Sequence, residues 1–421
     1  MKLNRLVLLT AAAVSLQGCS PDLTRPTTET SPEQSLLGAR GQHSAGWTEI
    51  NAAAPWEARA GLQAVRLGRD FYIMGGRTPR APSGPVVIPG DSDIWADVWK
   101  SRDRGRTWRQ VNDGAGANHW PARAYFQAVT KQGRMFVLGG QDFGLIPNPD
   151  PTCAPFCPPF ISTSNFYNDV WSSRNGRRWE QLTSDAGWPP RAGLTSVVFR
   201  GEIYVFGGSF NDDSAVIGGP PQRVYFNDVW KSRDGRTWEL LTEAAPWLPR
   251  AGAAAVVKGG YIYLLGGEEG FLCQPVGSCT PPYFNDVWRT QDGVTWEEVT
   301  SSAGWSPRPG HQAVVLRNQI YVFGGFGQSQ DPSQPFAAAN PVDMWSSRDG
   351  AEWTQVTDNP WTASVPEDIK YDFDALSAGG SIYTFGGDRE TFDFFDVTNY
   401  LNVDNDVWRY TPERRRVRRG R

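Results

Sequence analysis

Residues 203–208 read Ile-Tyr-Val-Phe-Gly-Gly, and residues 227–230 read Asn-Asp-Val-Trp. The first stretch is dense in β-branched and aromatic residues, which favour strands, and its two glycines mark the strand's end. Both stretches recur along the chain in the same order. The first glycine of each double glycine is Gly75, Gly139, Gly207, Gly266, Gly324 or Gly386, at spacings of 64, 68, 59, 58 and 62 residues. Recurrence at such a period indicates a repeat architecture.

The 19 tryptophans follow the same repeat. One family ends each Asp-hydrophobic-Trp unit, a second follows eight or nine residues later, and a third precedes each repeat; together they account for every tryptophan except Trp95. The families are Trp99, Trp171, Trp230, Trp288, Trp345 and Trp408; Trp108, Trp179, Trp238, Trp296, Trp353 and Trp47; and Trp56, Trp120, Trp188, Trp247, Trp305 and Trp361. The last member of the second family, Trp47, lies before the first repeat. An N-terminal strand is therefore predicted to complete the last repeat.

Each repeat reads as four strands, so the sequence predicts an all-β, six-bladed β-propeller over residues 45–411, closed by its N-terminal strand. The double glycine, the aromatic residue of the third strand and the Trp that opens the fourth resemble the kelch repeat over about residues 46–410. The period is longer than the usual kelch period of about 50 residues, so the loops are expected to be enlarged.

Residues 101–108 also resemble the Asp-box hairpin of sialidase propellers, but we interpret them and their counterparts as tight Asp-Gly turns.

Composition and charge exclude several classes of protein. The 45 glycines and 32 prolines disfavour a helical bundle, and 13% aromatic residues disfavour disorder. Without Lys2, Arg5 and the six arginines of the basic tail at residues 412–421, 33 basic residues face 45 acidic ones, a formal charge of −12. An acidic body argues against nucleic acid as a partner.

The first 44 residues read as a targeting segment and a tether. Residues 1–18 have a basic start and a short apolar run, and Leu16-Gln17-Gly18-Cys19 resembles the lipobox of bacterial lipoproteins. We expect cleavage before Cys19, a lipid on its sulfur, and a flexible tether over residues 19–44. The expected location is the bacterial cell envelope, at the outer membrane, with the lipid anchor as the one membrane contact.

The other cysteines form two close pairs, for which two local disulfides are favoured among three connectivities. A zinc site is the alternative, disfavoured because the pairs lie in different repeats without a histidine. No metal and no cofactor are therefore expected. The four residues are Cys153, Cys157, Cys273 and Cys279.

Strand alternation separates two faces of the predicted propeller. The connections between second and third strands emerge on one face, here called the loop face. The Asp-Gly turns emerge on the opposite face, here called the turn face.

A basic residue stands 16 positions before the first glycine of every double glycine: Arg59, Arg123, Arg191, Arg250, Arg308 and Lys370. A ring of six cations on the loop face would attract an anion, such as a sugar acid or an acidic loop. The alternative is a structural ring tied to carbonyls or to the aspartates that recur in step, Asp97, Asp169, Asp228, Asp286, Asp343 and Asp406.

Departures from the repeat mark a second set of candidates. Four positions after the basic ring come Gln63, Gln127, Thr195, Ala254, Gln312 and Asp374, and Tyr125 and His311 lie beside this series. The sixth repeat carries Lys370-Tyr371-Asp372-Phe373-Asp374 and, after its double glycine, Asp388-Arg389-Glu390. These residues could form an acid/base site, a polar pocket or a solvated rim.

The resemblance to kelch propellers implies a protein-binding module or one of several enzymes. Copper oxidases of the galactose-oxidase type are also built on kelch repeats, but the three histidines of this chain do not supply the ligands of their copper site. We expect a monomeric, non-catalytic module that recognises a protein or an acidic glycan through the loop face. The alternative is a sugar-acid mutarotase or epimerase, which exported six-bladed kelch proteins resemble.

Overall fold

The computed structural model describes residues 46–81, 91–116, 118–148, 160–211, 223–270, 283–327, 340–356, 360–363, 368–390 and 401–413. Lipidation of Cys19, the tether and the basic tail beyond residue 413 lie outside these ranges and stay predictions. The same holds for the disulfides expected at Cys153, Cys157, Cys273 and Cys279.

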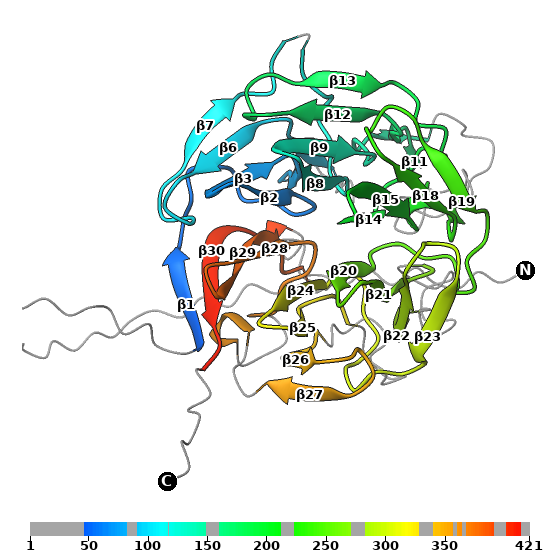
Figure 1. Ribbon diagram of the computed structural model, residues 1–421. Coiled ribbons are helices and arrows are strands. Elements are labelled where there is room, and N and C mark those ends of the chain that lie inside the picture. The colour runs from blue at the N-terminus through cyan, green and yellow to red at the C-terminus, as the bar shows by residue number, and fades with distance from the viewer. Residues whose placement is uncertain are drawn as a thin grey trace, which may run out of the picture. The chain divides into compact units, whose positions relative to one another are not determined.

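The described strands form six antiparallel sheets of four strands, called blades 1 to 6. Blade 1 contains β2 (Gln63–Leu67), β3 (Asp70–Met74), β6 (Val98–Ser101) and β7 (Arg109–Asn112); blade 2 contains β8 (Gln127–Lys131), β9 (Arg134–Leu138), β12 (Val170–Ser173) and β13 (Glu180–Thr183). Blade 3 contains β14 (Thr195–Phe199), β15 (Glu202–Phe206), β18 (Val229–Ser232) and β19 (Glu239–Thr242); blade 4 contains β20 (Ala254–Lys258), β21 (Tyr261–Glu268), β22 (Tyr283–Thr290) and β23 (Trp296–Thr300). Blade 5 contains β24 (Gln312–Leu316), β25 (Gln319–Phe323), β26 (Met344–Ser347) and β27 (Trp353–Val356); blade 6 contains β28 (Asp374–Ala378), β29 (Ser381–Asp388), β30 (Val403–Thr411) and β1 (Gly46–Asn51). The first strand of each blade lies nearest the centre of the ring (Figure 1).

The N-terminal strand closes the ring as predicted. β1 pairs antiparallel with β30, with Trp47 opposite Tyr410, so blade 6 has the strand order β1-β30-β29-β28. Three small hairpins extend the second-to-third-strand connections on the loop face: β4 (Arg77–Pro79) with β5 (Ser92–Ile94), β10 (Leu145–Pro147) with β11 (Phe160–Ser162), and β16 (Ser209–Phe210) with β17 (Val224–Tyr225). The six-bladed fold predicted from the repeats is confirmed.

A closed ring of backbone hydrogen bonds surrounds the axis. Just before each first strand, one residue donates its N–H to the carbonyl of the corresponding residue in the preceding blade, over 2.8–3.0 Å. The six residues are Gly61, Tyr125, Gly193, Gly252, Gly310 and Asp372, and all have φ between 49° and 64°. Four are glycines, which adopt this left-handed conformation without a Cβ penalty. Tyr125 and Asp372 adopt it at a cost of about 1–2 kcal/mol each.

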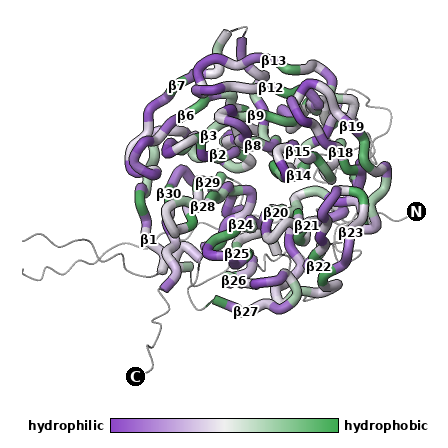
Figure 2. The backbone as a smooth tube through the Cα atoms, viewed as in Figure 1, coloured by the Kyte–Doolittle hydropathy of each residue, from purple (hydrophilic) through white to green (hydrophobic). Residues whose placement is uncertain are grey.

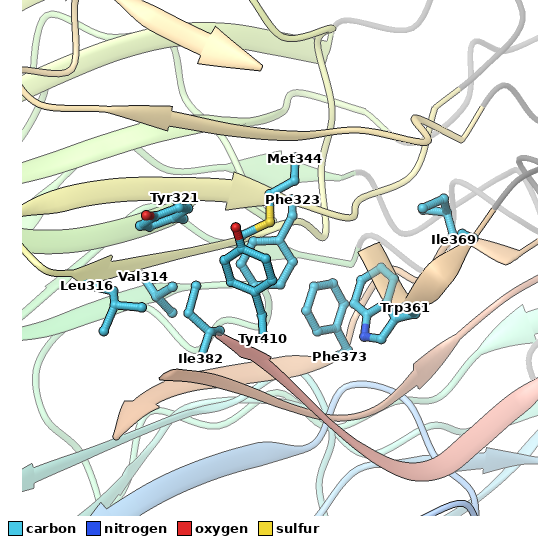
Figure 3. Packing of buried hydrophobic residues seen from close by; sticks show 11 residues of the cluster. Val314, Leu316, Tyr321, Phe323, Met344, Trp361, Ile369, Phe373, Ile382 and Tyr410 are labelled. Carbon is cyan, nitrogen blue, oxygen red and sulfur yellow. The ribbon is translucent and has the colours of Figure 1, made fainter. Parts of the chain in front are cut away.

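The tryptophans form the core inside and between the blades. The second and third families meet as six pairs with ring centroids 5.5–6.4 Å apart, five of them edge-to-face, an arrangement that aromatic rings prefer. Figure 3 shows part of this core, where Trp361 from the 3-10 turn η2 (Pro360–Thr362) lies against Phe373 and Phe323. Hydrophobic residues recur within the sheets around the ring (Figure 2). The tryptophan excess therefore serves packing.

No helix within the described ranges is long and apolar enough to cross a membrane.

Ring closure depends on Trp47, whose ring lies 5.3–5.7 Å from the rings of Tyr410, Trp361 and Phe323. We expect Trp47→Ala to lower the free energy of unfolding by about 2–4 kcal/mol, because the half-buried indole leaves a cavity at the closure. Urea denaturation followed by tryptophan fluorescence measures the change. The control is Glu49→Ala at an exposed residue of the same strand, and equal losses in the two variants would contradict the assignment.

Candidate functional site

The basic ring is a set of buried internal ion pairs. Arg191 is fully buried and donates from Nη1 and Nη2 to the two carboxylate oxygens of Asp228, at 2.5 and 2.8 Å. Its Nη1 also donates to the carbonyl of Gly207 at 2.9 Å, and the indole of Trp230 donates to the same aspartate at 2.8 Å. This group of Arg, Asp and glycine carbonyl, here called the blade latch, leaves no guanidinium surface for a ligand in this conformation.

The latch recurs in five blades with nearly the same distances. The other four pairs are Arg59 with Asp97, Arg123 with Asp169, Arg250 with Asp286, and Arg308 with Asp343. In blade 6, Lys370 lies against Asp404 at 2.9 Å and in short contact with Asp406, while Arg389 reaches Asp404 at 2.5 Å.

These contacts are the ones expected if the basic ring is structural, with each cation bonded to an aspartate or a carbonyl inside its blade. All six cations are 0–1% exposed. A role of Arg59, Arg123, Arg191, Arg250, Arg308 and Lys370 in binding a ligand stays a prediction, and the geometry favours a different location for the ligand.

The series four positions after the ring connects neighbouring blades. Gln63 accepts from the N–H of Ala128 at 2.9 Å, and Thr195 donates to the carbonyl of Ala253 at 3.0 Å. Asp374 accepts from the N–H of Ala64 at 2.6 Å, which ties blade 6 to blade 1. Polar side chains at these positions hold the first strands together.

His311 is a buried core residue. Its ring lies 5.6 Å from that of Trp305, and burial lowers the pKa of His311 to about 3. The imidazole is therefore neutral at physiological pH.

Five side chains converge near the axis on the loop face: Arg77, Tyr125, Asp372, Asp388 and Glu390, here called the axial cluster. Arg77 is the first residue of β4, Asp388 is the last residue of β29, and Glu390 lies two residues after Asp388. Tyr125 and Asp372 are the two non-glycine residues of the ring of backbone hydrogen bonds. Arg77 donates from Nη2 to Asp388 at 2.6 Å and from Nε to the hydroxyl of Tyr125 at 2.6 Å. Blades 1, 2 and 6 therefore all contribute to one polar site.

The axial cluster has more carboxyl groups than cations. Asp388 is fully buried and paired with Arg77, whereas Asp372 and Glu390 form no ion pair within the described ranges. Burial, and next the charge of Asp388, raise the pKa of Asp372 to about 7 and that of Glu390 to about 8. Burial also raises the pKa of Asp388. Near neutral pH the cluster therefore holds protons that an incoming cation could replace.

The carboxyl groups do not form a metal site on this geometry. Among the described residues, no group of three or more His, Cys, Asp and Glu side chains is arranged to hold a metal ion.

The sequence identified most of the axial cluster but not Arg77. Tyr125, Asp372, Asp388 and Glu390 were candidates as departures from the repeat, while Lys370, Asp374 and His311 prove to serve the latch, a blade contact and the core. Arg77 could have been found by comparing the residues that follow each double glycine: Arg77, Gln141, Ser209, Glu268, Phe326 and Asp388. That series contains a cation and an anion in neighbouring blades.

Comparisons with known proteins agree with this fold. The sequence model of the KLHDC2/KLHL20/DRC7 Kelch-repeats domain matches residues 61–325. Beta-scruin of Limulus polyphemus is 30% identical over 166 residues, which cover 39% of this chain and 16% of scruin; Kelch domain-containing protein 1 of Mus musculus is 24% identical over 233 residues, which cover 52% and 55%. The matches thus span about half or less of these relatives. A solved structure titled "Structure of YjhT" has a TM-score of 0.58 at 15% identity and covers 86% of this chain and 97% of its own, which shows the fold alone.

The blade latch predicts a large stability effect. We expect Arg191→Met to lower the free energy of unfolding by about 3–5 kcal/mol, because it leaves the Asp228 carboxylate buried without its cation. Adding Asp228→Asn should recover part of the loss, as a double-mutant cycle in urea would measure. The control is Arg200→Met at an exposed arginine of the same blade. Unchanged stability of Arg191→Met together with lost capture of acidic glycans would restore the ligand-binding interpretation of the ring.

Proposed function

The chain belongs to the kelch-repeat family, and from that premise we propose that it is a non-catalytic binding module that recognises a basic segment of a protein partner at its axial cluster. The observation that carries this proposal is the imbalance of charge at the cluster. Arg77 pairs with Asp388, while Asp372 and Glu390 have no ion-pair partner among the described residues. A lysine or arginine side chain supplied by a partner would complete the pairing.

The position of the cluster supports recognition of a partner rather than a role in folding. Tyr125 and Asp372 occupy two of six backbone positions where the other four are glycine, and both retain partial exposure at the loop face. Non-glycine residues in this conformation are strained, and such strain is common at functional sites. The fold thus keeps two side chains that glycine would replace without strain.

An acidic glycan, the other ligand class expected from the sequence, has less support at the loop face. The cations that would hold its carboxylate or sulfate groups are already paired with aspartates inside the blades. The partly exposed carboxyl groups of the axial cluster, Asp372 and Glu390, would repel such a ligand once they are ionised.

The proposal predicts that a cation binds more tightly as pH rises. Deprotonation of Asp372 and Glu390, with pKa values near 7 and 8, creates the anionic form that binds, so the affinity should rise about tenfold or more between pH 6 and pH 9. Calorimetric titration of N-acetyl-arginine methylamide into the full chain measures this, with proton release expected at pH 7. A pH-independent affinity would overturn the proposal.

Three variants make that titration specific. Asp372→Gly restores the residue found at four of the six ring positions, so we expect it to abolish most of the binding while the denaturation midpoint is unchanged or raised. Glu390→Gln removes one carboxylate charge and should weaken binding above pH 8. Glu243→Gln removes one charge from an exposed glutamate elsewhere, and it should bind like the unaltered protein. An equal loss in Glu243→Gln would mean that overall charge, and not the cluster, attracts the ligand.

A second candidate function is an acid/base isomerase of the sugar-acid mutarotase type. Two carboxyl groups that titrate near neutral pH, beside an arginine and a tyrosine, supply a proton donor, a proton acceptor and a carboxylate partner. If this function is correct, the protein accelerates anomer exchange of sialic acid in NMR exchange spectra, and Asp372→Asn abolishes the acceleration. Exchange rates equal to those in buffer would exclude this activity on sialic acid.

A further inference from the structure

We propose that the turn face carries an oxyanion-binding pocket between blades 2 and 3, separate from the axial cluster and on the opposite face of the ring. A cavity of about 260 Å³ opens there. Its wall includes five basic side chains, Lys131, Arg134, Arg174, Arg233 and Arg236, and two acidic ones, Glu180 and Asp234. A formal charge of +3 in one cavity of an acidic chain points to an anion as the ligand.

Turns of two blades bring these side chains together. Lys131 and Arg134 flank the turn between β8 and β9, and Arg174 lies in the turn between β12 and β13, all in blade 2. Arg233 and Arg236 come from the turn between β18 and β19 of blade 3. Lys131 donates its Nζ to the carbonyl of Arg233, so the two blades are in direct contact at the cavity.

The acidic groups of the cavity are already occupied. Glu180 accepts from Arg134 at 2.8 Å and from Arg236 in a short contact, and these two arginines lower the pKa of Glu180. Asp234 accepts from the backbone N–H groups of Arg236 and Thr237, at 2.8 and 3.0 Å, which closes its own turn. Glu180 thus has a donor on both oxygens and Asp234 uses Oδ1 to close its turn, and neither forms an ion pair with Arg174 or Arg233 among the described residues.

Arg174 and Arg233 are the cations left for a ligand. Arg174 is exposed and has no hydrogen bond or ion pair within the described part of the chain. The Arg233 side chain is 87% exposed, and its ion pair is long, with 3.8 Å from its Nε to the carboxylate oxygen of Glu202, so its guanidinium stays open to solvent. Two guanidinium groups at the mouth of one cavity can bind the oxygens of a single phosphate or sulfate group through paired hydrogen bonds.

The Asp-Gly turn does not require these cations, because the corresponding turn of blade 4 contains none. In the corresponding turn of blade 4, Gln291 replaces Arg174 or Arg233, and Val294, half exposed, replaces Arg236. The turn of blade 4 nevertheless forms the same Asp-Gly hydrogen bonds, from Val294 and Thr295 to Asp292. The basic residues of blades 2 and 3 are thus additions to a turn that is complete without them.

The cavity suits a small ester better than a bare ion. Phe136 and Leu182 form an apolar part of its wall next to the cations. A ligand with a phosphate or sulfate group and a compact organic body, such as a monosaccharide, would use both parts. The group could belong to a small ester or to the end of a sulfated polysaccharide.

Titration of the full chain with glucose 6-phosphate, glucose 6-sulfate and a heparin tetrasaccharide at low ionic strength tests the proposal, with calorimetry as the readout. We expect binding of at least one probe and a loss of about tenfold or more in affinity for Arg174→Gln/Arg233→Gln. Tight binding of the monosaccharide esters identifies a small ligand, and binding of the heparin fragment alone identifies a polysaccharide. Failure of all three probes would overturn the proposal.

Two matched variants separate the pocket from general attraction and from the axial cluster. Arg348→Gln/Arg200→Gln removes two exposed arginines of the turn-face turns outside the cavity, and it should keep the affinity of the unaltered protein. A loss equal to that of Arg174→Gln/Arg233→Gln would show that the whole face attracts anions and would overturn the pocket. Asp372→Asn, in the axial cluster, should leave anion binding unchanged even if it abolishes cation binding.

Discussion

The blade latch is the interaction on which the rest of this structure depends. A buried guanidinium is tolerated only when its charge and its N–H groups have partners. Arg191 shows the pattern, donating to both oxygens of one aspartate, to one glycine carbonyl and, through Nε, to the carbonyl of the residue two positions earlier. The aspartate in turn accepts from the tryptophan two residues later in five of the six blades. Three sequence signals, the arginine, the double glycine and the Asp-hydrophobic-Trp unit, are therefore parts of one contact.

The latch also explains why the double glycine recurs. Both glycines have positive φ, and a Cβ at Gly207 or Gly208 would lie 2.9 Å from a backbone carbonyl oxygen. Such a distance is shorter than real Cβ contacts, so any side chain would displace the strand end to which the arginine is bonded. Two constraints therefore act at the same strand end: the close carbonyl oxygens exclude a side chain from the glycines, and the buried arginine requires the glycine carbonyl as a partner.

The sequence predicted the blades, the closure by Trp47 and the packing role of the tryptophans, because each of these repeats at fixed spacing. It also placed Asp97 and its counterparts in step with the arginines but left open whether they were partners. It could not predict that Arg77 meets Asp388, since these residues are 311 positions apart and only closure of the ring brings them together. The charged pocket between blades 2 and 3 was missed for a similar reason, because Arg174 and Arg233 look like equivalent turn residues until the two turns are seen to share a cavity.

The two candidate sites carry ionisable groups of opposite sign, and they differ in how deeply those groups are buried. A raised pKa in the folded protein means that the fold stabilises the protonated carboxyl. The stability that Asp372 and Glu390 contribute is therefore lost as pH rises from the ordinary carboxyl pKa of about 4 to the folded-state values of about 7 and 8. A bound cation would offset that loss, which couples the axial cluster to its ligand. At the turn face, Arg174 and Arg233 are exposed cations, and no buried carboxyl has to lose a proton before they can meet an anion. Proton release from the protein's own carboxyl groups on binding is therefore a property that distinguishes the axial cluster from the turn-face pocket within the same molecule.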